Sequence, residues 1–389
     1  MKKILFIVWS FSMGGGVEKV LSQVLNNIDV EKYDISVLEF HNFGIKEEII
    51  PREIKILKPI LKQYEGNNKF KTILNKLQIK IARIVSKYFP CILRKIYLKD
   101  KYDVEIACNY MIPTFLLSKS KSTKKICWVH EEILDYKDIS SLIERIKGLE
   151  NYRIQKRAFI NSDAVVGISK RIYNSIVDNY PEIITKCNII NNGFDFENIN
   201  LKSKEEIDFK VEDYIPIIVS IGRLDHNKNQ RLLIDSVKIL KEKGYKFRVL
   251  FIGEGENQEL LHKYSKDLGL DEYITWKGYI NNPYPYIRLS HILAITSYSE
   301  GFPTVAIEAL TLGTALVSTD VAGINEITNG YEYCKISKRY PVEYAEKLEE
   351  VLLELGKNSH EKLLEDGKDY VKKFNIDRQV KAFYELIEG

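Results

Sequence analysis

Short apolar runs alternate with amphipathic segments along most of the 389 residues. Runs rich in Ile, Val and Leu that are bounded by glycine or polar residues are typical of buried strands, and segments with apolar positions at helical spacing are typical of covering helices. This alternation favours parallel sheets covered by helices. We expect strands at residues 4–9, 34–40, 104–108, 125–129, 164–168, 188–191, 216–221, 247–252, 274–276, 292–296 and 314–318.

A polar, charged stretch interrupts this rhythm at residues 194–213, FDFENINLKSKEEIDFKVED, and we interpret it as a linker. The chain is long enough for two α/β domains of ordinary size. We therefore predict two Rossmann-like domains joined near residue 205, one over residues 1–200 and one over 201–389. The last helix of the second domain is a candidate for packing back on the first.

The N-terminus, MKKILFIVWSFSMGGGVEKVL, places two lysines before an apolar run, as secretory signals do. It has no small-x-small cleavage site, and the run ends in three glycines followed by an amphipathic segment. A strand, a glycine turn and a helix are the better interpretation, so we predict a cytoplasmic protein. The five cysteines are scattered without CxxC spacing, which favours free thiols over disulfides or zinc.

Ligands bind outside the carboxyl ends of the strands in parallel α/β sheets, so the residues that follow each strand are the candidates for chemistry. Gly15 and Gly16 follow the first strand, where a backbone without side chains can approach a ligand closely. Arg223 and Lys228 follow another strand, and a planar guanidinium with a point charge suits a pyrophosphate. Gly253 follows the next strand.

The stretch SEGFPTVAIEAL at residues 299–310 carries two glutamates, Glu300 and Glu308, on either side of a proline. Pro303 suits the first position of a helix that runs to about Leu312, where Gly313 ends it. Glu300 then lies on the loop at the sheet edge, and Glu308 lies in the second turn among apolar neighbours, an unusual setting for a solvated charge. Free N–H groups around Phe302, Thr304 and Val305 would face a ligand. His130 also follows a strand and is a further candidate.

Together these motifs resemble the family-four retaining glycosyltransferases of the GT-B fold, of the kind that assembles bacterial surface polysaccharides. The similarity spans nearly the whole chain, and its specific part is the pair of glutamates with Gly-Phe-Pro between them. It is carried by Gly15-Gly16-x-Glu18, His130, Asn192-Gly193-Phe194-Asp195, Gly222-Arg223-Leu224 with Lys228, Ile252-Gly253-x-Gly255, Glu300-Gly301-Phe302-Pro303 through Glu308, and Gly323-x-x-Glu326. The resemblance implies two Rossmann-like domains whose parallel sheets face each other across a cleft.

The resemblance also implies a role for each matching residue. Arg223 and Lys228 would hold the donor pyrophosphate, and Gly15 and Gly16 would approach the phosphate or sugar. Glu308 would bind the ribose hydroxyls, His130 would contact the sugar, and Gly253 would lie near the base. Glu300 and the backbone of Gly301, Phe302, Pro303, Thr304 and Val305 would position the donor sugar. Two departures from the family's usual residues, Lys19 for arginine and Asn229 for glycine, leave this charge pattern intact.

The resemblance therefore implies retaining, metal-independent transfer of a sugar from a nucleotide-sugar donor, with a UDP-sugar favoured over a GDP-sugar. No cofactor or metal is expected, because two cations already serve the phosphate and no DxD pair stands at a strand end. The alternatives are a nicotinamide oxidoreductase, which the absence of GxGxxG disfavours, a sugar-nucleotide epimerase of the same fold, and a non-catalytic partner protein. The motifs do not specify the base, the sugar, the acceptor, the linkage, the role of Glu300 or the oligomeric state.

Charge is concentrated between Arg52 and Lys125, where 18 lysines and arginines stand against 5 acidic residues, although the whole chain carries only +4. Within the basic segment 68–100, apolar residues recur at helical spacing beside a row of cations, and Pro90 then breaks the helix. A cationic amphipathic helix suits an anionic membrane surface. An ordinary domain helix with a lysine-rich face is the alternative, and nucleic acid is disfavoured because no binding motif accompanies the charge. We expect peripheral association with the inner face of the cytoplasmic membrane and a glycan acceptor that is lipid-linked.

Overall fold

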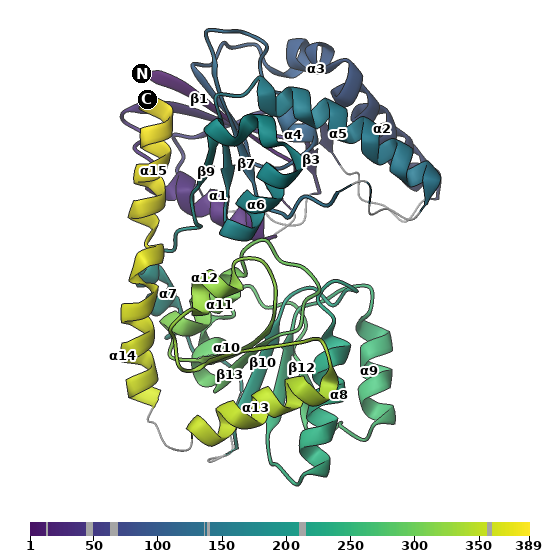
Figure 1. Ribbon diagram of the computed structural model, residues 1–389, viewed down its shortest axis with the longest axis vertical. Helices are drawn as coiled ribbons and strands as arrows, with labels where there is room; N and C mark the ends of the chain where they lie inside the picture. The colour runs from purple at the N-terminus through teal and green to yellow at the C-terminus, as the bar shows by residue number, and fades with distance from the viewer. Residues whose placement is uncertain are drawn as a thin grey trace. The chain divides into compact units, whose positions relative to one another are not determined.

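The computed structural model describes residues 1–12, 15–43, 50–62, 69–135, 137, 141–209, 215–355 and 360–389. The chain divides into two compact units (Figure 1). Unit 1 consists of Met1–Gly193 together with Ile376–Gly389, and unit 2 consists of Phe194–Asn375. We predicted a domain boundary at residue 200. In the structure, unit 1 ends at Gly193 and also includes the last 14 residues of the chain.

Unit 1 is built on a seven-stranded, all-parallel sheet in the order β4-β2-β1-β6-β7-β8-β9. Its strands are β1 Lys2–Val8, β2 Tyr33–Glu39, β4 Lys55–Ile56, β6 Val104–Ala107, β7 Lys124–Val129, β8 Ala164–Gly167 and β9 Cys187–Ile189. A two-stranded sheet pairs β3 His41–Asn42 with β5 Leu61–Lys62. Its helices are α1 Gly16–Asn27, α2 Lys69–Tyr88, α3 Pro90–Tyr97, α4 Ile112–Phe115, α5 Leu142–Ile160, α6 Lys170–Asn179 and α15 Ile376–Glu388, with a 3₁₀ turn over Pro181–Lys186.

Unit 2 is built on a six-stranded, all-parallel sheet in the order β12-β11-β10-β13-β14-β15. Its strands are β10 Ile217–Ile221, β11 Arg248–Ile252, β12 Ile274–Trp276, β13 Ile292–Ile295, β14 Ala315–Thr319 and β15 Cys334–Ser337. Its helices are α7 Phe196–Lys202, α8 Gln230–Glu242, α9 Gln258–Asp267, α10 Tyr284–Leu289, α11 Thr304–Thr311, α12 Ile324–Thr328, α13 Pro341–Leu355 and α14 His360–Val371, with a 3₁₀ turn over Lys372–Phe374. In order along the chain this is strand order 3-2-1-4-5-6, the Rossmann arrangement.

All eleven expected strands are present, each within two residues of its expected ends. The sequence missed β15 and the two-residue strands β3, β4 and β5, whose apolar content is too low for the pattern to detect. The expected linker was wrong at its start, because α7 occupies Phe196–Lys202. The Asp195 side chain accepts a hydrogen bond from the backbone N–H of Asn198 at 2.9 Å, and this N-cap explains why a polar stretch begins as a helix.

The last helix, α15, packs within unit 1 against α1 (Figure 1). The Tyr33 hydroxyl donates to the Glu388 carboxylate at 2.6 Å, and Lys2 pairs with the same carboxylate at 2.8 Å. Phe383 reaches the sheet and packs edge-on against Trp128 of β7 at 4.7 Å between ring centroids. The end of the chain therefore completes the core of the unit in which the chain begins.

A buried ion pair fixes α3 to the sheet of unit 1. Both guanidinium ends of Arg94 donate to the Glu105 carboxylate of β6, at 2.8 and 2.6 Å, and Glu105 is 1% exposed. The same carboxylate accepts the backbone N–H of Ser118 at 2.6 Å. A buried carboxylate tolerates this position only while its partners are present, because an unpaired buried charge is strongly unfavourable.

We predict that Arg94→Ala lowers the free energy of unfolding of unit 1 by about 3–5 kcal/mol, because it leaves Glu105 buried and unpaired. The neighbouring exposed variant Lys95→Ala should change it by less than about 0.5 kcal/mol. Urea unfolding followed by tryptophan fluorescence checks this, since Trp9 and Trp128 report on unit 1 and Trp276 on unit 2. Equal losses for the two variants would show that the pair does not carry this stability.

Candidate functional site

The strand order of unit 2 reverses between β10 and β13, and crevices that bind ligands in open parallel sheets form at such a reversal. The loop after β10 carries Arg223 and Lys228, and the loop after β13 carries Glu300. The sequence-predicted residues of the second half of the chain therefore flank the switch point of the sheet.

An ion pair joins these two loops. The Lys228 ammonium donates to Oε1 of Glu300 at 2.6 Å, and the Ser297 hydroxyl donates to the same oxygen at 2.6 Å. Both charged side chains are largely covered, at 24% and 16% exposure. The backbone adds to the link, because Tyr298 N–H donates to the Asn227 carbonyl at 2.8 Å and Thr296 Oγ1 donates to the Lys228 carbonyl at 2.7 Å.

Arg223 differs from Lys228 in its setting. Its side chain is 64% exposed and pairs with Asp225 of its own loop at 3.2 Å. Asp225 also accepts the backbone N–H of Lys228 at 2.9 Å, so one carboxylate orders both ends of the loop that carries the two cations. An exposed guanidinium with one local partner is free to turn toward an incoming anion at small cost.

Glycines at the ends of β10 and β11 pack backbone against backbone. A Cβ on Gly253 would lie 1.9 Å from the carbonyl oxygen of Gly222, and both glycines have positive φ, +138° and +149°. A Cβ on Gly222 would in turn lie 3.1 Å from Cε of Lys228. Gly253, expected near the base, therefore has a structural role here: it lets the β10 loop approach, and Gly222 lets the Lys228 side chain cross the strand end.

The substitution of Asn229 for the family's usual glycine has a physical explanation. Asn229 is the N-cap residue of α8 and lies in the left-handed region at φ 47°, ψ 46°. Asparagine is among the non-glycine residues that adopt this conformation most readily.

Helix α11 carries the second glutamate. It begins at Thr304 with Pro303 as its N-cap residue, one residue later than expected, and its C-cap is Leu312. Glu308 is fully buried at 0% exposure, as its apolar neighbours in the sequence indicated. Along the approach to the helix, Gly301, Thr304 and Val305 are half-buried, whereas Phe302 and Pro303 are buried. Phe302 packs where a Cβ on Gly323 would be, 2.6 Å from Phe302 Cδ2, which explains the glycine of the last motif.

The glycine turn of unit 1 lies at the start of α1. Gly15 is the N-cap residue, and Gly15 and Gly16 are both exposed. The buried Glu18 folds back over this end of its own helix, so that a Cβ on Gly15 would lie 2.6 Å from its Oε2. A carboxylate therefore occupies the positive end of the α1 dipole, where a phosphate would otherwise bind.

His130 follows β7 in the same unit and is 9% exposed. Its ring lies 4.4 Å from that of Trp128, between centroids. Burial lowers the pKa of the His130 imidazole to about 3, so the ring is neutral at physiological pH. Within the part of the chain that the structure describes, its buried Nε2 has no hydrogen-bond partner. A neutral imidazole can accept or donate a hydrogen bond to a hydroxyl group but offers no positive charge to a phosphate.

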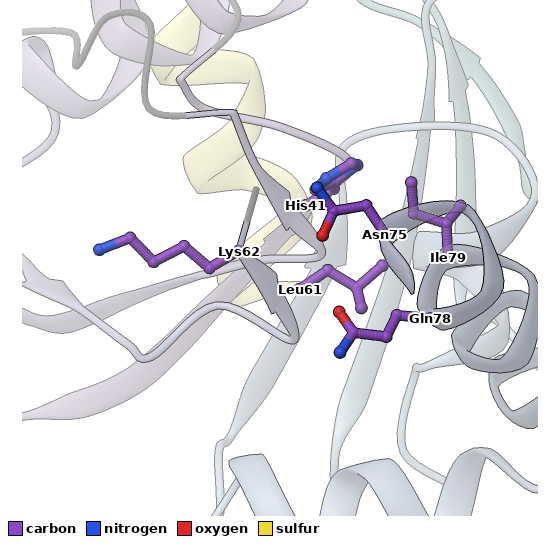
Figure 2. Close-up of a pocket in the computed structure, with 6 residues that line it drawn as sticks. All are labelled: His41, Leu61, Lys62, Asn75, Gln78 and Ile79. Atoms are coloured by element: carbon purple, nitrogen blue, oxygen red, sulfur yellow. The ribbon is translucent and has the colours of Figure 1, made fainter. Parts of the chain in front are cut away.

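A small pocket lies between α2 and the two-stranded sheet of unit 1 (Figure 2). It is lined by His41 and Leu61 from the sheet and by Asn75, Gln78 and Ile79 from α2, while the Lys62 side chain extends away from the others (Figure 2). The pocket space is about 220 Å³, which includes space open to solvent.

Sequence reasoning missed three residues that organise these sites. Asp225 lies between Arg223 and Lys228, and Ser297 follows the expected strand 292–296. Both positions were candidates for partners of the charged side chains. The third, Glu39, is the last residue but one of the apolar run DISVLEF at residues 34–40. An acidic residue near the end of a buried strand could have identified it. Among the described residues, no group of three His, Cys, Asp or Glu side chains is placed to hold a metal ion.

We predict that the free energy of unfolding falls with decreasing pH partly because of His130. The unfolded chain binds a proton there below about pH 6.5, whereas the folded protein does so only near a pKa of about 3. Between pH 6.5 and 5 this amounts to a loss of about 2 kcal/mol, at ~1.4 kcal/mol per pH unit. Chemical denaturation at both pH values should show this loss in the wild type and in the exposed control His226→Gln, but not in His130→Gln. The same pH dependence in all three would contradict it.

Three comparisons bear on these sites. Residues 203–370 match the family model described as glycosyl transferases group 1. Over 173 residues the chain is 35% identical to the N-acetylgalactosamine-N,N'-diacetylbacillosaminyl-diphospho-undecaprenol 4-alpha-N-acetylgalactosaminyltransferase of Campylobacter jejuni, a match that covers 44% of this chain and 46% of that relative. Over its full length it is 25% identical to the GalNAc-alpha-(1->4)-GalNAc-alpha-(1->3)-diNAcBac-PP-undecaprenol alpha-1,4-N-acetyl-D-galactosaminyltransferase of the same organism, covering 98% of that protein.

The fold also matches solved structures over the whole chain. One is the crystal structure of Anabaena Alr3699/HepE in complex with UDP, with a TM-score of 0.70 at 15% identity, covering 99% of each chain. At this identity the likeness concerns the fold, and it agrees with two Rossmann-like units, each with its own parallel sheet. The family match over residues 203–370 and the likeness in fold agree with the resemblance given by the motifs, and the chain has the GT-B fold.

Proposed function

We propose that the protein is a retaining glycosyltransferase that moves a sugar from a nucleotide-sugar donor, with UDP as the first candidate, to a glycan acceptor in cell-surface polysaccharide assembly. The observation that carries this proposal is the cation pair at the switch point of unit 2, where Arg223 and Lys228 stand on one loop beside Glu300. The family match and the glycan-assembling activities in the names of the relatives support it.

The donor pyrophosphate would bind where these cations meet the start of α11. The first backbone N–H groups of that helix have no acceptor within the helix, and its dipole favours negative charge there. Glu300 holds Lys228 in place until the diphosphate arrives, and the released carboxylate can then accept a hydroxyl of the sugar. Glu308 would take the ribose hydroxyls. Because Glu18 covers the end of α1, we expect Gly15 and Gly16 to meet the neutral sugar rather than the phosphate.

In the transfer step the bond between the sugar C1 and the diphosphate oxygen breaks, and the acceptor hydroxyl oxygen bonds to C1 on the same face. The departing diphosphate takes the acceptor proton. Arg223, Lys228 and the α11 N–H groups stabilise the charge that develops on the leaving diphosphate, so that no metal ion is required for this role. A neutral His130 is suited to contact a sugar hydroxyl.

We predict that one nucleoside diphosphate raises the midpoint of thermal unfolding, with and without EDTA. UDP, GDP, ADP, dTDP and NAD are compared, and a ligand at about 100 times its Kd stabilises by ~2.7 kcal/mol. Lys228→Ala should abolish that shift and lower the transfer rate on the order of 10²–10³-fold. The matched control Lys238→Ala removes a half-buried lysine paired with Glu242 on α8 and should change neither. A shift only with NAD, or near-wild-type turnover by Lys228→Ala, would overturn the donor assignment.

The acceptor we propose is a lipid-linked glycan at the inner face of the cytoplasmic membrane, reached by docking of α2 and α3. Between Asn75 and Tyr88, the buried residues of α2 are the small Ala82 and Ser86. Over the same residues, several apolar side chains of α2 are exposed, and exposed apolar side chains follow on α3. We call this exposed set the α2–α3 ridge: Leu77, Ile81, Ile84, Tyr88, Phe89, Ile92 and Ile96, each 45–58% exposed.

Cations border this ridge. Lys76, Lys80, Arg83 and Lys95 are exposed beside it, and the helices carrying them lie in the segment with 18 basic and 5 acidic residues. Contiguous exposed apolar residues mark interaction surfaces, and their combination with lysine and arginine suits anionic headgroups. Within the described residues no helix combines the length and hydropathy of a membrane span. The ridge would therefore lie on the bilayer surface.

We predict that the protein sediments with vesicles containing anionic phosphatidylglycerol at low salt, and less with neutral phosphatidylcholine. The double variant Ile81→Asp/Ile92→Asp should lower the apparent affinity at least about tenfold, because it places charge in the apolar contact. Leu260→Asp, at an exposed apolar position on α9 of unit 2, is the control and should bind as the wild type does. Equal binding by both variants, or none by the wild type, would contradict docking through the ridge.

A further inference from the structure

Glu39 is a buried carboxylate that the proposed chemistry does not use. It is the last residue of β2, at the carboxyl edge of the unit 1 sheet, and is 4% exposed. Burying a carboxylate is costly unless hydrogen bonds compensate for the lost water. The partners of Glu39 therefore indicate what the carboxylate is for.

Three of these partners belong to the loop after β1. Oε1 of Glu39 accepts the backbone N–H of Phe11 at 2.6 Å, the Ser12 hydroxyl at 2.7 Å and the Ser10 hydroxyl at 3.2 Å. Oε2 accepts the side-chain amide of Asn42, in β3, at 2.7 Å. One carboxylate thus gathers donors from residues 10–12, which are in neither a helix nor a strand.

The same loop is held at two further points. Ser12 Oγ, which donates to Glu39, also accepts the backbone N–H of Phe43 at 2.8 Å, so the segment after β1 is joined directly to the residue after β3. On the other side, Trp9 N–H donates to Oδ1 of Asn109 at 2.7 Å, from the loop after β6. Strands β1 and β6 flank the point at which the strand order of unit 1 reverses.

We propose that Glu39 is a positioning residue: it fixes the loop at Ser10–Ser12 and thereby sets the position of the glycine turn that follows at Gly15 and Gly16. This inference rests on the proposed function, in which that turn meets the sugar. Groups that contact a reacting sugar act through placement, and a misplacement of about 1 Å can cost a factor of 10² in rate. A carboxylate suits the task because one oxygen can accept several donors at once.

The first test measures the loop directly, by hydrogen exchange of the wild type, Glu39→Ala and Glu39→Gln. In Glu39→Ala the amides of Phe11 and Ser12 should exchange at least about tenfold faster. The Phe11 N–H loses its acceptor, and the hydroxyls of Ser10 and Ser12 lose the carboxylate that holds this segment in place. Glu39→Gln should keep wild-type protection, since its carbonyl oxygen can still accept the three donors of the loop. The matched control is Glu105→Gln, which alters an equally buried carboxylate on β6 and should leave residues 10–12 unchanged. Wild-type protection in Glu39→Ala would overturn the proposal.

The second test separates binding from turnover. It follows hydrolysis of the nucleotide sugar whose nucleoside diphosphate stabilises the wild type, read as release of that diphosphate. Glu39→Ala should lower kcat roughly 10–100-fold while KM stays within about threefold, because unit 2 holds the nucleotide. Glu39→Gln should restore kcat, and Glu105→Gln should keep it at temperatures where the variant is folded. Unchanged kcat in Glu39→Ala, or no rescue by Gln, would contradict positioning.

These outcomes are distinguishable from a failure of the proposed function. If the wild type neither binds a nucleoside diphosphate nor hydrolyses any nucleotide sugar, the proposed function fails, whatever the exchange data show for the loop. If the wild type does both and Glu39→Ala matches it, the proposed function stands and the role of Glu39 is wrong.

Discussion

The ion pair between Lys228 and Glu300 is the contact on which the arrangement of the candidate site in unit 2 depends, because it joins the two loops at the switch point of the sheet. It joins the loop after β10 to the loop after β13, with 2.6 Å between the Lys228 ammonium and Oε1 of Glu300. The Ser297 hydroxyl donates a hydrogen bond to the same oxygen. A pair of this kind, one quarter exposed or less, adds little stability by itself but gives both side chains a defined position. In the proposed function, a doubly charged diphosphate would gain from cations that are already in position.

This pair also explains the glycines that surround it. Gly253 admits the backbone of Gly222, Gly222 admits the side chain of Lys228, and Lys228 then reaches Glu300. A methyl group on Gly222 or Gly253 would collide with its neighbour and separate these contacts. Both residues also have a positive φ, which favours glycine. Gly222 and Gly253 look like ligand contacts in the sequence. In the structure they allow the Lys228 side chain to reach Glu300.

The sequence was sufficient for what depends on local pattern. Strand positions follow from apolar runs, and the approximate place of the site follows from the rule that ligands bind past strand ends. The sequence did not determine the environment of a side chain that could lie either in the core or at the surface. The apolar stripe of α2 predicts a helix, but the stripe of an ordinary domain helix faces the core, whereas here Ala82 and Ser86 face inward and Ile81 faces out. Glu39 was missed because its four partners come from segments that only the fold brings together.

The two helix ends that the sequence treated alike differ in charge, and this difference divides the chemistry between the units. Before α11, the loop that leads into the helix carries Glu300, which pairs with Lys228, so a negative group bound there would gain from a cation and from the helix dipole. At α1 the carboxylate of Glu18 already lies over the helix start, so a second anion there would meet repulsion. The buried His130 of the same unit is neutral as well, because burial lowers its pKa. In the proposed function, phosphate recognition would therefore fall to unit 2 and contacts with sugar hydroxyl groups to unit 1.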